Sequence, residues 1–183
     1  PETEIMVERI LGLSKMFSKP NILEIGSGSG APAVTVAIDN PESSILSVDI
    51  SKKALDVARE NAEKYSVKNI LFSKSDIFSN VKGNFDIIFS NPPYISEEEY
   101  RYLDKEIYKE PEMALVAKNN GLYFFEEISL KSKDHLASDG YLIFEIGKNQ
   151  SKAVRSILSK RFKSINFKKD YNGIDRIVVA TNR

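Results

Sequence analysis

The chain has 183 residues, with 26 basic and 26 acidic side chains, one histidine and no cysteine. This length predicts one domain over residues 1–183, and the lack of cysteine excludes disulfide frameworks, iron–sulfur clusters and thiol nucleophiles. The lone His135 makes a His-based triad or metal site improbable, so no metal is predicted. No apolar run approaches the ~20 residues of a membrane span and no signal peptide begins the chain, so a soluble cytoplasmic protein is expected.

Segments typical of strands alternate with amphipathic segments typical of helices. Expected helices cover residues 1–17, 32–38, 51–65, 121–136 and 150–162. Expected strands cover residues 22–25, 45–49, 69–72, 85–89 and 141–146, and a hairpin joins 165–167 to 174–180 around Asn172-Gly173. Apolar strands separated by helices indicate an α/β, Rossmann-like fold. We expect a mostly parallel seven-stranded sheet with helices on both faces and a C-terminal antiparallel hairpin.

A glycine-rich loop follows the first strand, in the run Gly26-Ser27-Gly28-Ser29-Gly30. Glycines at such a turn let the backbone approach a ligand, and the N-terminus of the next helix offers unpaired N–H groups. Asp49 ends the second strand, where a carboxylate can accept hydrogen bonds from both hydroxyls of a ribose. A plain tight turn is the alternative interpretation, which the position of Asp49 disfavours. The pattern therefore predicts a site for a nucleotide-like cofactor.

The run Gly26-x-Gly28-x-x-Ala31 is also compatible with a dinucleotide site, and two features favour S-adenosylmethionine instead. Glu24, at the end of the first strand, could hold an ammonium group through the loop. Asp76, after the third strand, could accept a hydrogen bond from the adenine amino group while Ile77 packs on the ring. The alternative interpretations of these residues are a capping acid and a core residue.

The run Asn91-Pro92-Pro93-Tyr94 follows the fourth strand and is predicted to face the same cleft. The nitrogen of a planar NH₂ group is a poor nucleophile because its lone pair is delocalised. The Asn91 side-chain oxygen and the Pro92 carbonyl can accept its two hydrogens, while Tyr94 packs on the flat face of the substrate. The rate of methyl transfer to this nitrogen then comes from positioning and electrostatics, and the reaction requires no catalytic cysteine or histidine. Asn91, Pro92 and Tyr94 are the predicted catalytic residues, and Pro93 completes the substrate-binding loop.

With these motifs in place, the chain resembles the HemK/PrmC family of class I S-adenosylmethionine-dependent methyltransferases. The resemblance covers essentially the whole chain in colinear order. Besides the glycine loop, Asp49 and the Asn-Pro-Pro-Tyr loop, it is carried by Pro1-Glu2-Thr3-Glu4, Glu110-Pro111-x-x-Ala114-Leu115, Glu145-Ile146-Gly147-x-x-Gln150 and Lys169-Asp170-x-x-Gly173-x-Asp175-Arg176.

The resemblance implies methylation of the side-chain amide N5 of a glutamine in a peptide-chain release factor, with S-adenosylhomocysteine as the second product. It also implies that residues 26–30, Asp49, Ile77 and Asn91 bind the cofactor. Glu24 replaces an aspartate usual in the family, and the family's N-terminal helical domain is expected to be absent from this chain.

Other functions stay open at this point. A nucleic-acid methyltransferase acting on adenine N6 or guanine N2 is the first alternative. From Glu145 onward, Lys and Arg outnumber Asp and Glu by ten to three. These basic side chains could contact nucleic-acid phosphates, and solvent-exposed helix and hairpin faces explain them equally well. The acidic stretch 97–112 is interpreted as a solvated helical face. An NAD-dependent oxidoreductase or a catalytically silent partner-binding domain would leave the Asn-Pro-Pro-Tyr loop unexplained.

Overall fold

The computed structural model describes residues 2–102 and 111–183, apart from the side chain of Glu2. Two parts of the sequence prediction lie outside the described residues. One is Pro1, in the leading helix and the first family motif. The other is the segment 103–110, which includes part of the acidic stretch and Glu110 of the Glu110-Pro111 motif.

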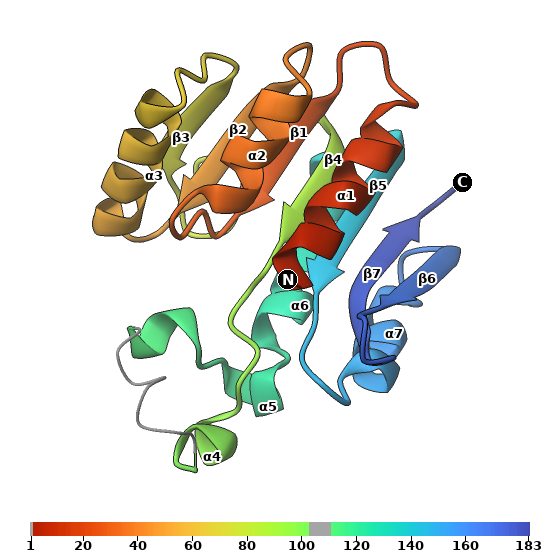
Figure 1. Cartoon of the computed structure of the whole chain (residues 1–183). Helices are drawn as coiled ribbons and strands as arrows, with labels where there is room; N and C mark the ends of the chain where they lie inside the picture. The colour runs from red at the N-terminus through yellow and green to blue at the C-terminus, as the bar shows by residue number, and fades with distance from the viewer. Residues whose placement is uncertain (1, 103–110) are drawn as a thin grey trace.

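Strands and helices alternate along the chain and build one sheet of seven strands (Figure 1). The strands are β1 (Asn21–Ile25), β2 (Ser44–Asp49), β3 (Ile70–Lys74), β4 (Phe85–Ser90), β5 (Leu136–Glu145), β6 (Ser164–Lys169) and β7 (Asp175–Thr181). Their order is β3-β2-β1-β4-β5-β7-β6. Strands β1 to β5 are parallel, and β7 is antiparallel to both β5 and β6. The predicted fold and its C-terminal hairpin are confirmed.

Helices cover both faces of this sheet. They are α1 (Glu2–Ser14), α2 (Ala31–Asp39), α3 (Lys52–Lys64), α4 (Glu97–Tyr100), α5 (Lys118–Gly121), α6 (Tyr123–Lys131) and α7 (Ser151–Leu158), with 3₁₀ turns at Glu112–Ala114 and Ser132–Asp134. Within the described ranges, no helix is both long and apolar enough to cross a membrane.

Each central strand is apolar on both sides because each face carries its own core. On one face, Ile22 and Ile87 pack with α1 and α2. Their sequence neighbours Leu23 and Ile88 pack on the other face with α6 and α7. Adjacent strand residues point to opposite faces, so an unbroken apolar run is what a sheet covered on both sides requires.

The single helix expected over residues 121–136 is wrong. Helix α6 ends at Lys131, and β5 begins at Leu136, earlier than the expected strand at 141–146. The strand starts early because Leu136 pairs with Phe85 and Tyr141 pairs with Ile87, so an irregular, bulged stretch of β5 lies opposite the start of β4. The apolar spacing around Leu136 fits a helix equally well, and only the pairing with β4 selects the strand.

Candidate active site

The predicted site residues gather at the carboxyl ends of the parallel strands, at the lower end of the sheet in Figure 1. The strand order reverses between β1 and β4, which is the switch point where open α/β sheets bind ligands. Ile25 is the last residue of β1, Ser90 is the last residue of β4, and the two pair directly. The Ser90 hydroxyl also donates to the Ile25 carbonyl at 2.7 Å. The glycine loop and the Asn91 loop therefore leave the sheet side by side.

The glycine loop has a backbone shape that its glycines make possible. Gly26, Gly28 and Gly30 all have positive φ, at 84°, 52° and 76°. A Cβ at Gly26 or Gly28 would extend into open space, whereas a Cβ at Gly30 would lie 2.8 Å from the Cβ of Ala58. Gly30 thus allows close packing against α3, while the backbone at Gly26 and Gly28 borders open space near the start of α2.

Asp49 connects this loop to the start of α3. One carboxylate oxygen accepts from the Gly28 N–H at 2.9 Å, and the other accepts from the Ser51 N–H at 2.8 Å. The side chain is half-exposed, so its remaining lone pairs stay accessible beside the loop. The structure brings Asp49 and the glycine loop together, as the sequence predicts.

Glu24 lies beneath the loop and is buried. Its carboxylate accepts from the Ser47 hydroxyl, and Ser47 is 2.6 Å from the hydroxyl of Ser27 in the loop. Burial raises the pKa of Glu24 from 4.5 to about 8, although hydrogen bonds from Ser47 and the Ala33 backbone oppose the shift. This position supports the loop from below. The expected contact with a ligand ammonium group stays a prediction.

Asp76 and Ile77 follow β3 in a tight turn. Asp76 is exposed, whereas Ile77 is buried and has a φ of 50°, which is rare for a β-branched residue. The Ser75 hydroxyl holds the turn by donating to the Ile77 carbonyl at 3.0 Å and accepting from the Asn80 N–H at 3.0 Å. A strained residue kept in place by its surroundings is a feature of ligand sites.

Ile50 is a candidate that the sequence reasoning missed. It directly follows Asp49 and leaves 47% of its surface exposed, which is unusual for a large apolar side chain. Its signal in the sequence is an apolar residue placed between the acidic end of β2 and the Ser51 N-cap of α3. An apolar side chain there can cover the flat face of a base.

The Asn91–Tyr94 loop is anchored at its far end. The Ile95 N–H donates to the Leu115 carbonyl at 3.0 Å, and the Ile95 carbonyl accepts from the Ala117 N–H at 2.9 Å. Pro92 is buried, Tyr94 is half-buried and Asn91 is exposed. The loop therefore presents the Asn91 side chain from a fixed backbone next to the glycine loop.

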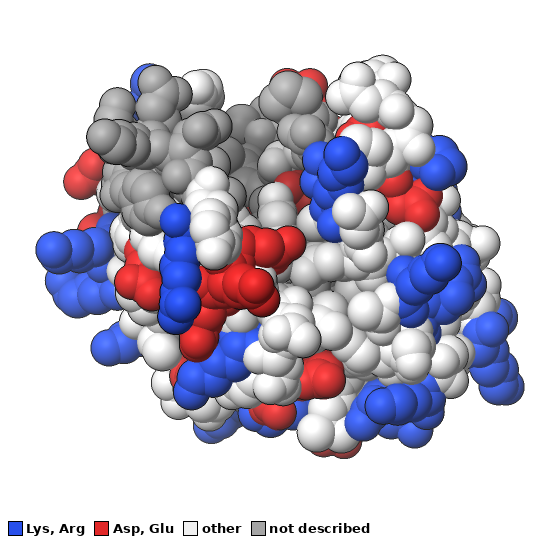
Figure 2. Space-filling model, turned by 90° about the horizontal axis from the view of Figure 1, so that it is seen from below, with Lys and Arg blue, Asp and Glu red and all other residues white. Residues whose placement is uncertain are grey.

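The end of the molecule at which β4 and β5 finish is seen face-on in Figure 2. Acidic side chains form the largest coloured group near the middle of this view, and Lys and Arg lie mostly toward its rim. Asp49 and Asp76 contribute negative charge at this edge of the sheet.

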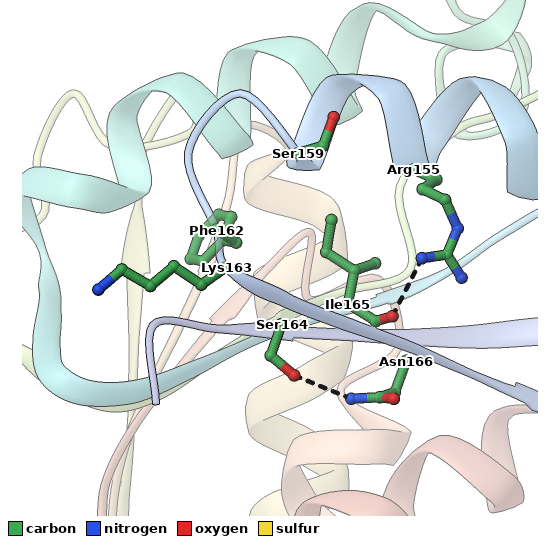
Figure 3. Close-up of a pocket in the computed structure, with 7 residues that line it drawn as sticks. All are labelled: Arg155, Ser159, Phe162, Lys163, Ser164, Ile165 and Asn166. Atoms are coloured by element: carbon green, nitrogen blue, oxygen red, sulfur yellow. Dashed lines mark hydrogen bonds between the residues drawn. The ribbon is translucent and has the colours of Figure 1, made fainter.

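A separate hollow between α7 and β6 is shown in Figure 3. Arg155 and Lys163 are its two cations, and Arg155 donates to the Ile165 carbonyl at 3.3 Å and lies 4.7 Å from the centre of the Phe167 ring. The Asn166 side-chain amide donates a hydrogen bond to the Ser164 hydroxyl. These hydrogen-bonded side chains are engaged within the protein, and none belongs to the carboxyl edge of β1, β2 or β4, so we assign no ligand to this hollow.

The fold and the paired loops define the class as a Rossmann-like methyltransferase. The model of the methyltransferase small domain matches residues 3–121, and the chain belongs to that family. A crystal structure of ribosomal protein L11 methylase from Lactobacillus delbrueckii subsp. bulgaricus has the same fold, with a TM-score of 0.68 and 20% identity. That match covers 100% of this chain and 78% of the other.

The chain is also similar to curated proteins named release factor glutamine methyltransferase. It is 43% identical to the protein from Fusobacterium nucleatum subsp. nucleatum, over 98% of this chain and 52% of that protein. It is 42% identical to the protein from Buchnera aphidicola subsp. Acyrthosiphon pisum, over 98% of this chain and 65% of that protein. The resemblance predicted from the motifs is confirmed, and the chain spans about half to two thirds of these relatives.

Proposed function

We propose that this protein transfers a methyl group from S-adenosylmethionine to the side-chain amide N5 of a glutamine in a peptide-chain release factor. The observation that carries the proposal is the pairing of Ile25 with Ser90, which sets the glycine loop beside the Asn91 loop. The names of the relatives support the choice of acceptor. Because termination of translation takes place in the cytoplasm, the proposal implies a cytoplasmic protein.

The open space at Gly26 and Gly28 is compatible with a bound cofactor, since a side chain at either glycine would stand between the ligand and the loop backbone. The loop backbone would hold its amino-acid part, and Asp49 would accept hydrogen bonds from the ribose hydroxyls. Ile50 and Ile77 would flank the adenine, with Asp76 accepting from its amino group. When bound, S-adenosylmethionine supplies an electrophilic methyl group and leaves as the neutral thioether S-adenosylhomocysteine.

The Asn91 loop would hold the acceptor. The Asn91 side-chain oxygen and the Pro92 carbonyl accept the two N–H hydrogens of the glutamine amide, which turns the nitrogen lone pair toward the methyl group. The Tyr94 ring packs on the flat amide. The new N–C bond forms as the S–C bond breaks, and one N–H proton is released to water. These residues act by alignment, and none changes its own protonation state.

Transfer of a radiolabelled methyl group to purified release factors tests the proposal. We expect Asn91→Ala to lower kcat by about 100-fold, because a misaligned acceptor loses most of the advantage of positioning. The affinity for S-adenosylhomocysteine, measured by calorimetry, should fall by less than kcat does, because Asn91 is only one of the expected cofactor contacts and the glycine loop and Asp49 are untouched. Asn182→Ala, an exposed asparagine near the C-terminus, is the matched control and should leave both quantities unchanged.

The acceptor is tested by replacing the glutamine of the release factor, which should abolish labelling. Label that appears in DNA or RNA and not in the release factor would instead support the adenine N6 or guanine N2 alternative. Binding of NAD without binding of S-adenosylhomocysteine would refute a methyltransferase function.

A further inference from the structure

We propose that Gln150 is a positioning residue that fixes the Asn91–Tyr94 loop in its acceptor-binding shape. This inference rests on the proposed function and extends it to a side chain that would not itself touch the cofactor or the acceptor. Gln150 lies in the turn between β5 and α7, far from the loop in sequence.

Both halves of the Gln150 amide are used. Its NH₂ group donates to the Tyr94 carbonyl at 2.9 Å, and its oxygen accepts from the Gly147 N–H at 2.9 Å. Two bonds at opposite ends of a planar amide fix the orientation of that amide, and with it the peptide group that follows Tyr94. Gln150 therefore joins the end of the acceptor loop to the turn after β5.

Two glycines make this approach possible. A Cβ on Gly121 would lie 2.1 Å from the Tyr94 carbonyl oxygen and 2.9 Å from the Gln150 nitrogen. A Cβ on Gly147 would lie 2.8 Å from the Tyr94 ring and 2.9 Å from the Gln150 oxygen. Gly121, Gly147 and Gln150 thus all lie against Tyr94. The packing leaves no room for a Cβ atom at either glycine.

The segment that brings Gly121 to Tyr94 is itself strained. Asn119 and Asn120 both have a φ of 54°, and Gly121 follows with 79°. Consecutive residues in the left-handed region persist only where the surrounding structure imposes them. The strain is located where α5 meets the acceptor loop, which is consistent with a contact that the site requires.

The contact bears on the chemistry because of the two prolines. The rings of Pro92 and Pro93 fix φ at both positions, so much of the freedom left in the loop lies at Tyr94 and the peptide group after it. The Leu115 carbonyl holds the N–H of that peptide group, and Gln150 holds its carbonyl. Without Gln150, we expect the Pro92 carbonyl and the Asn91 side chain to lose their common direction toward the acceptor amide.

The Gln150 side chain does not stabilise the helix that it precedes. Gln150 occupies the N-cap position of α7, but its side chain makes no capping hydrogen bond to that helix. Removal of the side chain should therefore disturb the Tyr94 contact more than α7 itself. This separates a positioning role from a role in helix stability.

The test compares Gln150→Ala with the wild type and with Lys152→Ala, an exposed control two residues further along, in α7. Gln150→Ala should lower kcat for methyl transfer by about 10- to 100-fold, as expected for a small displacement of the reacting groups. The affinity for S-adenosylhomocysteine should stay within about threefold, since the glycine loop and Asp49 are untouched. Hydrogen exchange should quicken in residues 91–96 and not in residues 21–30.

Gln150→Glu gives a second readout. It keeps an acceptor for the Gly147 N–H, but when ionised it has no hydrogen to donate to the Tyr94 carbonyl. We expect its activity, as a ratio to the wild type at each pH, to rise as the pH falls toward the ordinary glutamate pKa of about 4.3, where the carboxyl group can donate again.

Wild-type kcat and unchanged exchange in Gln150→Ala would overturn the inference. A wild-type protein that labels no release factor would refute the proposed function alone, because hydrogen exchange in residues 91–96 would still decide whether Gln150 holds the loop.

Discussion

At the scale of single residues, the candidate site depends on a few side chains that hold its backbone in place. Asp49 bonds to backbone N–H groups of both the glycine loop and α3. Glu24 is buried below the loop against Ser47. Both carboxylates could be placed at strand ends from the sequence, but only the structure separates an accessible acid from a buried one. Burial is what raises the pKa of Glu24.

The raised pKa of Glu24 predicts how stability depends on pH. The folded state keeps the Glu24 proton up to about pH 8, whereas the unfolded state loses it near 4.5, so the free energy of unfolding should fall as pH rises between these values. The fall should not exceed about 1.4 kcal/mol per pH unit. Glu24→Gln has no such proton and should show a flatter profile in urea unfolding at pH 5, 6.5 and 8. An equal slope in both proteins would contradict this account.

At the scale of elements, the C-terminal hairpin is joined to the turn that carries Gln150. Asp170 accepts from the N–H groups of Asn172 and Ile174 at 2.9 Å and from the Arg176 side chain at 3.1 Å. The Ile146 N–H in turn donates to the Arg176 carbonyl at 2.8 Å. The β6–β7 turn thus supports the backbone just before Gly147.

Asp170 predicts an acid-sensitive contribution from this hairpin. The Ile174 N–H, and then the Arg176 guanidinium, hold the pKa of Asp170 below its ordinary value. A lowered carboxyl pKa adds stability at neutral pH and loses it as pH falls through the folded-state value. Asp170→Asn should therefore unfold at lower urea than the wild type at pH 7, and the difference should shrink toward pH 3. Asp139→Asn, whose side chain is mostly exposed, serves as the control.

At the scale of the molecule, the sheet order brings the two loops together. Because β1 lies between β2 and β4, the glycine loop, Asp49 and Asn91 meet at one edge although they are separated in sequence. The helices on both faces leave this edge free for the loops. The meeting of these loops is thus a product of which strands are neighbours in the sheet.

Cofactor binding at this edge should stabilise the whole fold. S-adenosylhomocysteine at 100 times its Kd is expected to add about 2.7 kcal/mol to the free energy of unfolding, by mass action. For a domain of this size, that raises Tm by roughly 5–10 °C in a thermal unfolding scan. NAD should produce no shift, and Asp49→Ala should reduce the shift caused by S-adenosylhomocysteine. A shift with NAD alone would be incompatible with the proposed site.

Much of this protein can be predicted from local patterns. The glycine run, the acid after β2 and the Asn-Pro-Pro-Tyr loop are recognisable because backbone angles and side-chain types act over a few residues. Apolar runs interrupted by amphipathic segments likewise predict the parallel sheet and its hairpin. Where local patterns are ambiguous, as for residues 132–140, the expected helix is wrong and the pairing with β4 decides.

The contacts between distant segments were decided by the tertiary structure alone. Gln150 meets Tyr94 across 56 residues, and the missing Cβ of Gly30 matters only because Ala58 of α3 packs there. The burial of Glu24 likewise depends on Ser47 from the neighbouring strand. Local sequence determines which backbone shapes and hydrogen-bonding groups are available, whereas the packing of the complete sheet determines which of them meet.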